Sequence, residues 1–253
     1  MPAFLFLTVG CSLFTKDSDQ ISLELKDYSP LLERDYADHL SNFEALFLDT
    51  SSVSELSLSR VDEKYLLSLG QRIIKNNAIF FKQKESVSIY LIKDETPYHF
   101  SLPGKKVFLS TGLFKKYVQN ESLLMCVLTF ELIRSEKNIY KKLVTIPTGN
   151  LGAKEILPLL RLSATQKSQI HKWAFRLLKK LSIDSDTYLS WLQIQNRNSI
   201  DFSMQLGDIN VISREEALFK AFIIENSRGE RQRDYKRSSK SFYKFLRSVR
   251  NNS

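Results

Sequence analysis

The chain has 253 residues, of which 43% are hydrophobic and 26% are charged, so it can bury a sizeable core as one domain or as one domain with appendages. It contains only 8 glycines and no repeat of fixed period, which excludes collagen-like, glycine-loop and low-complexity proteins. The two cysteines, Cys11 and Cys126, lie far apart in different local contexts and imply no disulfide framework.

Charge is unevenly distributed along the chain, whose formal net charge is +9. Residues 12–57 carry ten acids against Lys16, Lys26 and Arg34, a net charge of −7. Residues 225–253 carry nine Lys and Arg against three acids, a net charge of +6. Such a basic C-terminal region attracts anionic partners such as phospholipid head groups, lipopolysaccharide or nucleic acid, and the alternative is a solvated tail that keeps the protein soluble.

The first eleven residues are apolar and uncharged up to Cys11, and the segment is too short to span a bilayer, which needs roughly 20 residues. An apolar stretch, a small residue and then a cysteine resemble the end of a bacterial lipoprotein signal, in which the cysteine receives lipid. A Lys/Arg region before the apolar stretch is absent, and Thr8 stands where that pattern usually has Leu. We expect residues 1–11 to be a signal remnant with Cys11 as the lipidation site; the alternative is a buried N-terminal strand.

Two helices are predicted in the first third of the chain. Apolar residues recur at three- and four-residue steps over residues 28–48 and again over residues 61–76, which is typical of amphipathic helices. A Ser/Thr-rich link, residues 49–58, separates them.

Three short extended segments follow. Alternating apolar residues predict a strand over residues 87–92, and residues 98–102 read as a second extended stretch. Pro103-Gly104 is a strong turn pair, after which residues 107–109 return as a third strand.

The most apolar helix is predicted over residues 123–133, with Asn120 as its N-cap. It is apolar on nearly every face, so we expect it to be central and buried. Further helices are expected in the remaining chain, over residues 156–182, 186–195, 214–225 and 235–250. The pattern predicts an α+β fold with a small sheet and many helices.

The central helix contains the run Phe130-Glu131-Leu132-Ile133-Arg134. A lone Glu131 on an almost wholly apolar helix is unfavourable unless the carboxylate is paired. Arg134 lies three residues further on and can pair with it along the helix. The simplest interpretation is a core helix whose end carries an ion pair.

The motifs around this helix, in their order, resemble the HtpX-like and CAAX-prenyl-protease-like zinc metallopeptidases over roughly residues 61–182. The ordered pieces are Tyr98-His99-Phe100, Leu102-Pro103-Gly104, Thr111-Gly112-Leu113, Asn120-Glu121 and the helix ending at Arg134. The resemblance implies a zincin-like fold, with a small mixed sheet, a central buried helix and several packing helices. It also implies that Tyr98, His99 and Phe100 form an edge strand that holds an extended peptide.

In that family two histidines four residues apart hold zinc, and the Glu between them is the general base for the zinc-bound water. Here Phe130 and Arg134 stand at the histidine positions, and only Glu131, the base, remains. Lys167 stands at the position of the third ligand, a Glu. The resemblance therefore implies that all three metal positions are lost, and we expect no zinc or other cofactor. We hypothesise that Arg134, with or without Lys167, occupies the vacated zinc position and pairs with Glu131.

A relocated metal site is the alternative. The resemblance would bring His99 and His171 near Glu131, and two histidines with one carboxylate suffice for a catalytic zinc. The chain would then be an active zinc metalloendopeptidase with an atypical site. We find no nucleophile elbow, phosphate loop or dinucleotide fingerprint in the sequence, and Cys126 on an apolar face is a poor nucleophile.

We expect four regions. Residues 1–11 are a signal remnant and residues 12–57 an acidic N-terminal helical segment. Residues 58–225 are a peptidase-like domain, and residues 226–253 are a basic C-terminal tail or helix. The resemblance implies a non-catalytic, chaperone-like lipoprotein of the bacterial envelope that faces the periplasm, at the outer membrane, and binds a peptide or envelope protein.

A further alternative is an unrelated helical lipoprotein whose basic tail binds anionic envelope lipids or polymers. Tyr235, Phe242, Tyr243 and Phe245 interleave with basic residues there, which suits a membrane interface or nucleic acid. In an exported protein we expect no nucleic acid as a partner. The other interpretation of this tail is a helix whose aromatic residues pack on the core.

Overall fold

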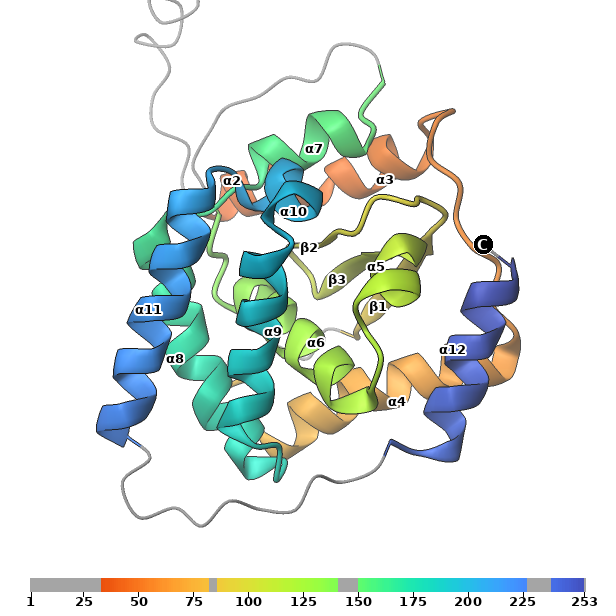
Figure 1. Ribbon diagram of the computed structural model, residues 1–253. Coiled ribbons are helices and arrows are strands. Elements are labelled where there is room, and N and C mark those ends of the chain that lie inside the picture. The colour runs from red at the N-terminus through yellow and green to blue at the C-terminus, as the bar shows by residue number, and fades with distance from the viewer. Residues whose placement is uncertain (1–32, 82–85, 141–149, 227–237, 253) are drawn as a thin grey trace, which may run out of the picture. The chain divides into compact units, whose positions relative to one another are not determined.

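The computed structural model describes residues 33–81, 86–140, 150–226 and 238–252 (Figure 1). The chain divides into two compact units, residues 1–36 and 37–253, and only the start of one helix is described in the first of them. The predicted lipidation site, Cys11, lies outside the described residues. No helix among the described residues is both long and apolar enough to cross a membrane.

The fold is mixed α+β with a small three-stranded sheet, which confirms the predicted fold class at that level. The elements, in chain order, are α2 (Glu33–Ser41), α3 (Phe43–Leu48), α4 (Arg60–Asn76), β1 (Ser88–Ile92), β2 (His99–Leu102), β3 (Lys106–Ser110), α5 (Thr111–Lys116), α6 (Glu121–Glu136), α7 (Ala153–Leu159), α8 (Ala164–Lys180), α9 (Ser185–Arg197), α10 (Ser199–Leu206), α11 (Ile209–Asn226) and α12 (Lys240–Asn252).

The sheet has the strand order β1-β3-β2. β1 pairs with β3 in parallel, with Ile89 opposite Val107, and β2 pairs with β3 antiparallel. The β2–β3 hairpin turns through Gly104 (φ 82°) and Lys105 (φ 56°), which is where the sequence predicts a turn. β2 is therefore an edge strand of the sheet.

An aromatic layer covers one face of the sheet. The rings of Phe100 and Phe108 stack with their centroids 4.6 Å apart, and Tyr90 stacks on Phe108 at 4.9 Å. Phe47 of α3 meets both phenylalanines edge-on, at 5.3 Å and 5.5 Å. Residues 37–57 are therefore an integral part of the unit that also contains the sheet.

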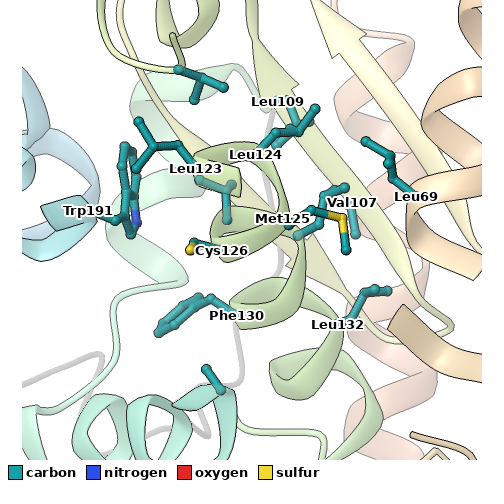
Figure 2. Close-up of a cluster of buried hydrophobic side chains, with 14 of the residues drawn as sticks. Leu69, Val107, Leu109, Leu123, Leu124, Met125, Cys126, Phe130, Leu132 and Trp191 are labelled. Carbon is teal, nitrogen blue, oxygen red and sulfur yellow. The ribbon is translucent and has the colours of Figure 1, made fainter. Parts of the chain in front are cut away.

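Helix α6 packs on the opposite face of the sheet and forms the centre of the core, as predicted. Every residue from Leu123 to Glu136 is buried, and the helix packs against β2, β3, α4, α8 and α9. Figure 2 shows its apolar side chains surrounded by Leu69 of α4, Val107 of β3 and Trp191 of α9. The Asn120 side chain accepts a hydrogen bond from the Leu123 amide at 2.8 Å, which confirms it as the N-cap.

The loop between β1 and β2 approaches the start of α5 closely. The Gly112 amide donates a hydrogen bond to the Asp94 carbonyl at 2.7 Å. A Cβ at this position would lie 2.2 Å from the Glu95 carbonyl oxygen, so the backbone contact requires glycine. This contact explains the glycine of the Thr111-Gly112-Leu113 motif.

Two long predicted helices are interrupted. Residues 28–48 were expected to form one helix, but α2 and α3 are separated at Asn42 within the described part. The prediction of one helix over residues 156–182 is wrong, because Ser163 starts α8 with a capping box to Gln166. Its Ser-x-x-Gln pattern was the missed local signal. Helix α10 was not predicted at all.

The C-terminal helix α12 packs against α4 and α5 with a fully apolar inner face, formed by Phe242, Phe245, Leu246 and Val249. The Phe245 ring lies 5.4 Å from that of Phe114 and 5.6 Å from that of Tyr65. Tyr243 is exposed, as are the basic residues of the outer face. Phe242 and Phe245 are therefore committed to the core and cannot serve a membrane interface in this arrangement.

Phe245→Ala is expected to lower the free energy of unfolding by about 3–5 kcal/mol, because it removes a buried ring between two helices. Tyr243→Ala, on the outer face of the same helix, is expected to change it by no more than about 0.5 kcal/mol. Urea unfolding of the two variants measures the difference. Equal losses would contradict the orientation of α12.

Candidate functional site

The carboxylate of Glu131 is fully buried on α6 and has three polar partners. His99 Nδ1 lies 2.6 Å from Oε1, and the Ser101 hydroxyl donates to Oε2 at 2.7 Å. Arg134 Nη1 lies 3.6 Å from the same Oε2. Because a carboxylate can only accept, His99 Nδ1 must carry the proton of its hydrogen bond.

The convergence of these groups follows from β2 crossing α6. Residues two apart in a strand face the same side, so His99 and Ser101 both project toward the helix. Residues three apart in a helix share a face, which places Arg134 beside Glu131. The Ser101 hydroxyl also lies 3.0 Å from the Glu131 backbone carbonyl, so β2 is held to α6 by backbone and side chain together.

The guanidinium of Arg134 joins three parts of the chain. Besides facing Glu131, its Nη2 donates to the carbonyl of Leu160, in the link between α7 and α8. Its Cζ lies 5.0 Å from the centroid of the Tyr140 ring, a cation–π distance. The structure thus places the hypothesised Glu131–Arg134 pair in the core.

The partners of Glu131 determine its protonation. Burial by itself raises the pKa of this carboxyl, but the hydrogen bond from His99 and the charge of Arg134 outweigh burial. The pKa is therefore held below the ordinary value of 4.5, and Glu131 is ionised at neutral pH.

Lys167 belongs to a second buried cluster. Its Nζ lies 2.7 Å from Oε1 of Glu215 on α11, and both side chains are only 4% exposed. Nζ also lies 3.4 Å from the Leu206 carbonyl oxygen. Of the two cations expected near Glu131, the structure pairs Arg134 with it and pairs Lys167 with a different carboxylate.

His171 lies one turn after Lys167 and completes this cluster. Its Nδ1 is 2.9 Å from the Tyr188 hydroxyl, and its Nε2 is 3.6 Å from Oε2 of Glu215. Burial lowers the pKa of His171, and the nearby Glu215 carboxylate only partly opposes this effect. The imidazole is therefore neutral at pH 7.

The ring of Phe130 lies against both histidines. Its centroid is 6.1 Å from that of His99 and 5.4 Å from that of His171. Figure 2 shows the ring projecting from α6 among other apolar side chains. An aromatic ring thus occupies the space next to each imidazole, and each histidine uses its own carboxylate.

These residues do not fit a zinc ion. Phe130 has no donor atom, and the cations of Arg134 and Lys167 are engaged by Glu131 and Glu215. In the described ranges no group of three His, Cys, Asp or Glu side chains is arranged to hold a metal. His99 and His171 meet different carboxylates, so the arrangement of a relocated site around Glu131 is not formed.

The predicted peptide-binding strand is covered. Tyr98, His99 and Phe100 are at most 2% exposed. The His99 amide donates to the Gln205 side chain of α10 at 3.1 Å. An added strand would have to displace α10 before it could pair with β2.

A third buried ion pair anchors the β2–β3 turn. Lys105 Nζ lies 3.2 Å from Oε2 of Glu136, and the Lys105 amide donates to the Ser135 hydroxyl at 2.8 Å. That hydroxyl in turn donates to the Leu102 carbonyl at 2.8 Å. The last turn of α6 therefore fixes the hairpin.

Several of these residues were not predicted. Ser101 could have been found, since it shares the strand face of His99 two residues earlier. Glu215 gave only a weak signal, as one of two adjacent acids in a helical pattern. Gln205 gave none, because the helix that carries it was missed.

Comparisons with known proteins assign no family to the chain. No protein-family model matches it, and no curated protein matches its sequence. What the site can do must therefore be inferred from its geometry. The Glu131 side chain is fully buried, and its carboxylate contacts His99, Ser101 and Arg134. A carboxylate held in this way has no solvent-facing surface from which to activate water.

Arg134→Ala is expected to lower the free energy of unfolding by about 3–5 kcal/mol, because it leaves the buried Glu131 carboxylate poorly compensated. In a Glu131→Gln background the same substitution should cost clearly less, since the charge to be compensated is gone. Denaturant unfolding of the four proteins measures the coupling. Arg197→Ala, at the exposed end of α9, is the control; equal costs in both backgrounds would contradict the pairing.

His171 predicts a pH dependence of stability. The pKa of His171 in the folded protein lies below 6.5, so the unfolded chain binds a proton more readily than the folded chain does. The contribution of the neutral imidazole to the free energy of unfolding is therefore fully present above about pH 6.5, and it is lost as the pH falls toward the folded-state pKa. His171→Gln should reduce the loss measured between about pH 7.5 and about pH 5.5. Because His39 and His99 remain in both proteins, an unchanged loss would contradict the buried neutral imidazole.

Proposed function

We propose that this chain is a non-catalytic relative of the HtpX-like and CAAX-prenyl-protease-like zinc metallopeptidases, and that it binds a peptide or protein in the bacterial envelope. The main support is the state of Glu131, the position of the family's general base. Its carboxylate is matched by the fixed cation of Arg134 and a hydrogen bond from His99, where the family has a divalent metal.

Charge balance supports the loss of the metal. The two clusters around α6 and α8 contain two buried carboxylates, Glu131 and Glu215, and two buried cations, Arg134 and Lys167. Each carboxylate has its own cation, so the site is electrically neutral without an added ion. A divalent cation placed there would be repelled by the positive charges of Arg134 and Lys167.

The order of elements supports the relationship to the family. An edge strand, a Pro-Gly hairpin, a glycine-dependent start of α5 and a wholly buried helix follow one another as the motifs predict. The zincin-like fold itself is part of the proposal. So is the envelope location, which depends on the apolar residues before Cys11 and would attach the protein to the outer membrane through lipid, facing the periplasm.

Restoring the ligands tests the proposal. Phe130→His, Arg134→His and Lys167→Glu together recreate the ligand set that the resemblance implies. We expect this variant to bind cobalt(II) with the absorption spectrum of a tetrahedral site, because α6 and α8 pack directly against each other. The unchanged protein should bind no zinc at about micromolar concentration in calorimetry.

The control is a triple variant with Phe130→His, Arg134→Lys and Lys167→Glu. It lacks one of the three ligands and should not bind cobalt tightly. If the triple variant folds only when zinc is added, the metal is again closing the site, which supports the proposal. A double variant, Phe130→His with Arg134→His, keeps the Lys167–Glu215 pair in case the triple variant is unstable. Folded variants without metal binding would contradict descent from a zinc site.

A further inference from the structure

A solvent-open groove of about 370 Å³ lies between α8 and α11, which pack side by side (Figure 1). One wall is formed by Thr165, Ser168, Gln169 and Lys172 of α8, and the other by Arg214 and Leu218 of α11.

A buried ion pair joins the two helices that form the groove. Lys167 lies next to Ser168 on α8, and Glu215 lies next to Arg214 on α11, so the 2.7 Å ion pair joins the same turns that form the walls. Because the pair fixes the distance between the two helices, the groove exists before any ligand arrives. Preorganisation of this kind lowers the entropic cost of binding.

The lining favours an anionic ligand with an apolar part. Lys172 and Arg214 supply two cations, and no acidic residue lines the groove. Neither cation has a carboxylate within ion-pair distance in the part of the chain that the structure describes. Leu218, which is 42% exposed, supplies apolar surface within the groove. The apolar surface can take the apolar face of an amphipathic helix, and the two cations complement acidic side chains beside that face.

We propose that the α8–α11 groove binds an acidic amphipathic peptide segment of a partner protein. This inference rests on the proposed function, according to which the protein binds a peptide or protein. It adds the surface of this chain that binds and the chemical character of the partner. The edge of β2 is a less suitable place for a peptide to bind, because the His99 amide already donates its hydrogen bond to Gln205. A concave groove between helices suits an inserted segment better than a flat membrane surface.

The probe is a fluorescent synthetic peptide of about 18 residues, with leucine at every third or fourth position and glutamate at most others. A matched peptide carries glutamine in place of glutamate. Fluorescence anisotropy should show that the protein binds the glutamate peptide at least about tenfold more tightly. Arg214→Glu and Lys172→Glu should each weaken this binding about tenfold or more, and Leu218→Ser should weaken it as well.

The control is Lys64→Glu, a charge reversal at an exposed position of α4 outside the groove, which should leave binding unchanged. An equal loss in this variant, equal binding of both peptides, or no binding would overturn the proposal. A fourth outcome would also overturn it: the protein binds phosphatidylglycerol vesicles but not the peptide, and Arg214→Glu abolishes the vesicle binding. The groove would then be a lipid site.

These outcomes are independent of metal restoration. A triple variant that binds cobalt, together with a groove that binds no peptide, would refute the groove and leave the family relationship in place. The reverse pair of results would refute the relationship and keep the groove. Because the substituted groove residues are exposed at the surface, circular dichroism should show folded variants throughout.

Discussion

A carboxylate buried in an apolar helix must be compensated, and this requirement organises the middle of the molecule. Glu131 obtains a proton donor from His99, a hydroxyl from Ser101 and a cation from Arg134. His99 and Ser101 thereby constrain the position of β2, and Arg134, on α6 itself, also binds the Leu160 carbonyl in the link before α8. Since an uncompensated buried charge costs several kcal/mol, the same contacts that satisfy the carboxylate also select one packing of these elements.

The buried polar groups around α6 form separate, locally neutral clusters, and the Phe130 ring lies between the two that contain histidines. A metalloenzyme concentrates such groups on one ion and keeps a position open for water. Here each of the two carboxylates, Glu131 and Glu215, is paired with a side-chain cation of the protein, and the Phe130 ring lies against both imidazoles. The proposed function is based on this contrast, and the groove between α8 and α11 is the surface that we propose for interaction with another molecule.

Local sequence patterns predicted the elements that depend on neighbouring residues. The burial of α6, its cap at Asn120 and the turn at Gly104 each follow from a few consecutive residues. The pairing of Lys167 with Glu215 could not be predicted, because the two are 48 residues apart and no periodicity links them. The break before Ser163 was missed for a different reason, since the apolar spacing continues through a capping signal. The family relationship stays a prediction.

The hydrogen bond from the His99 amide to Gln205 also bears on solubility. Edge strands with free amides and carbonyls are templates on which other chains add, and proteins with such edges form intermolecular sheets. In this molecule α10 closes the edge at β2 with a side chain. Unfolding of this short helix would therefore expose the edge of β2 as a template for self-association.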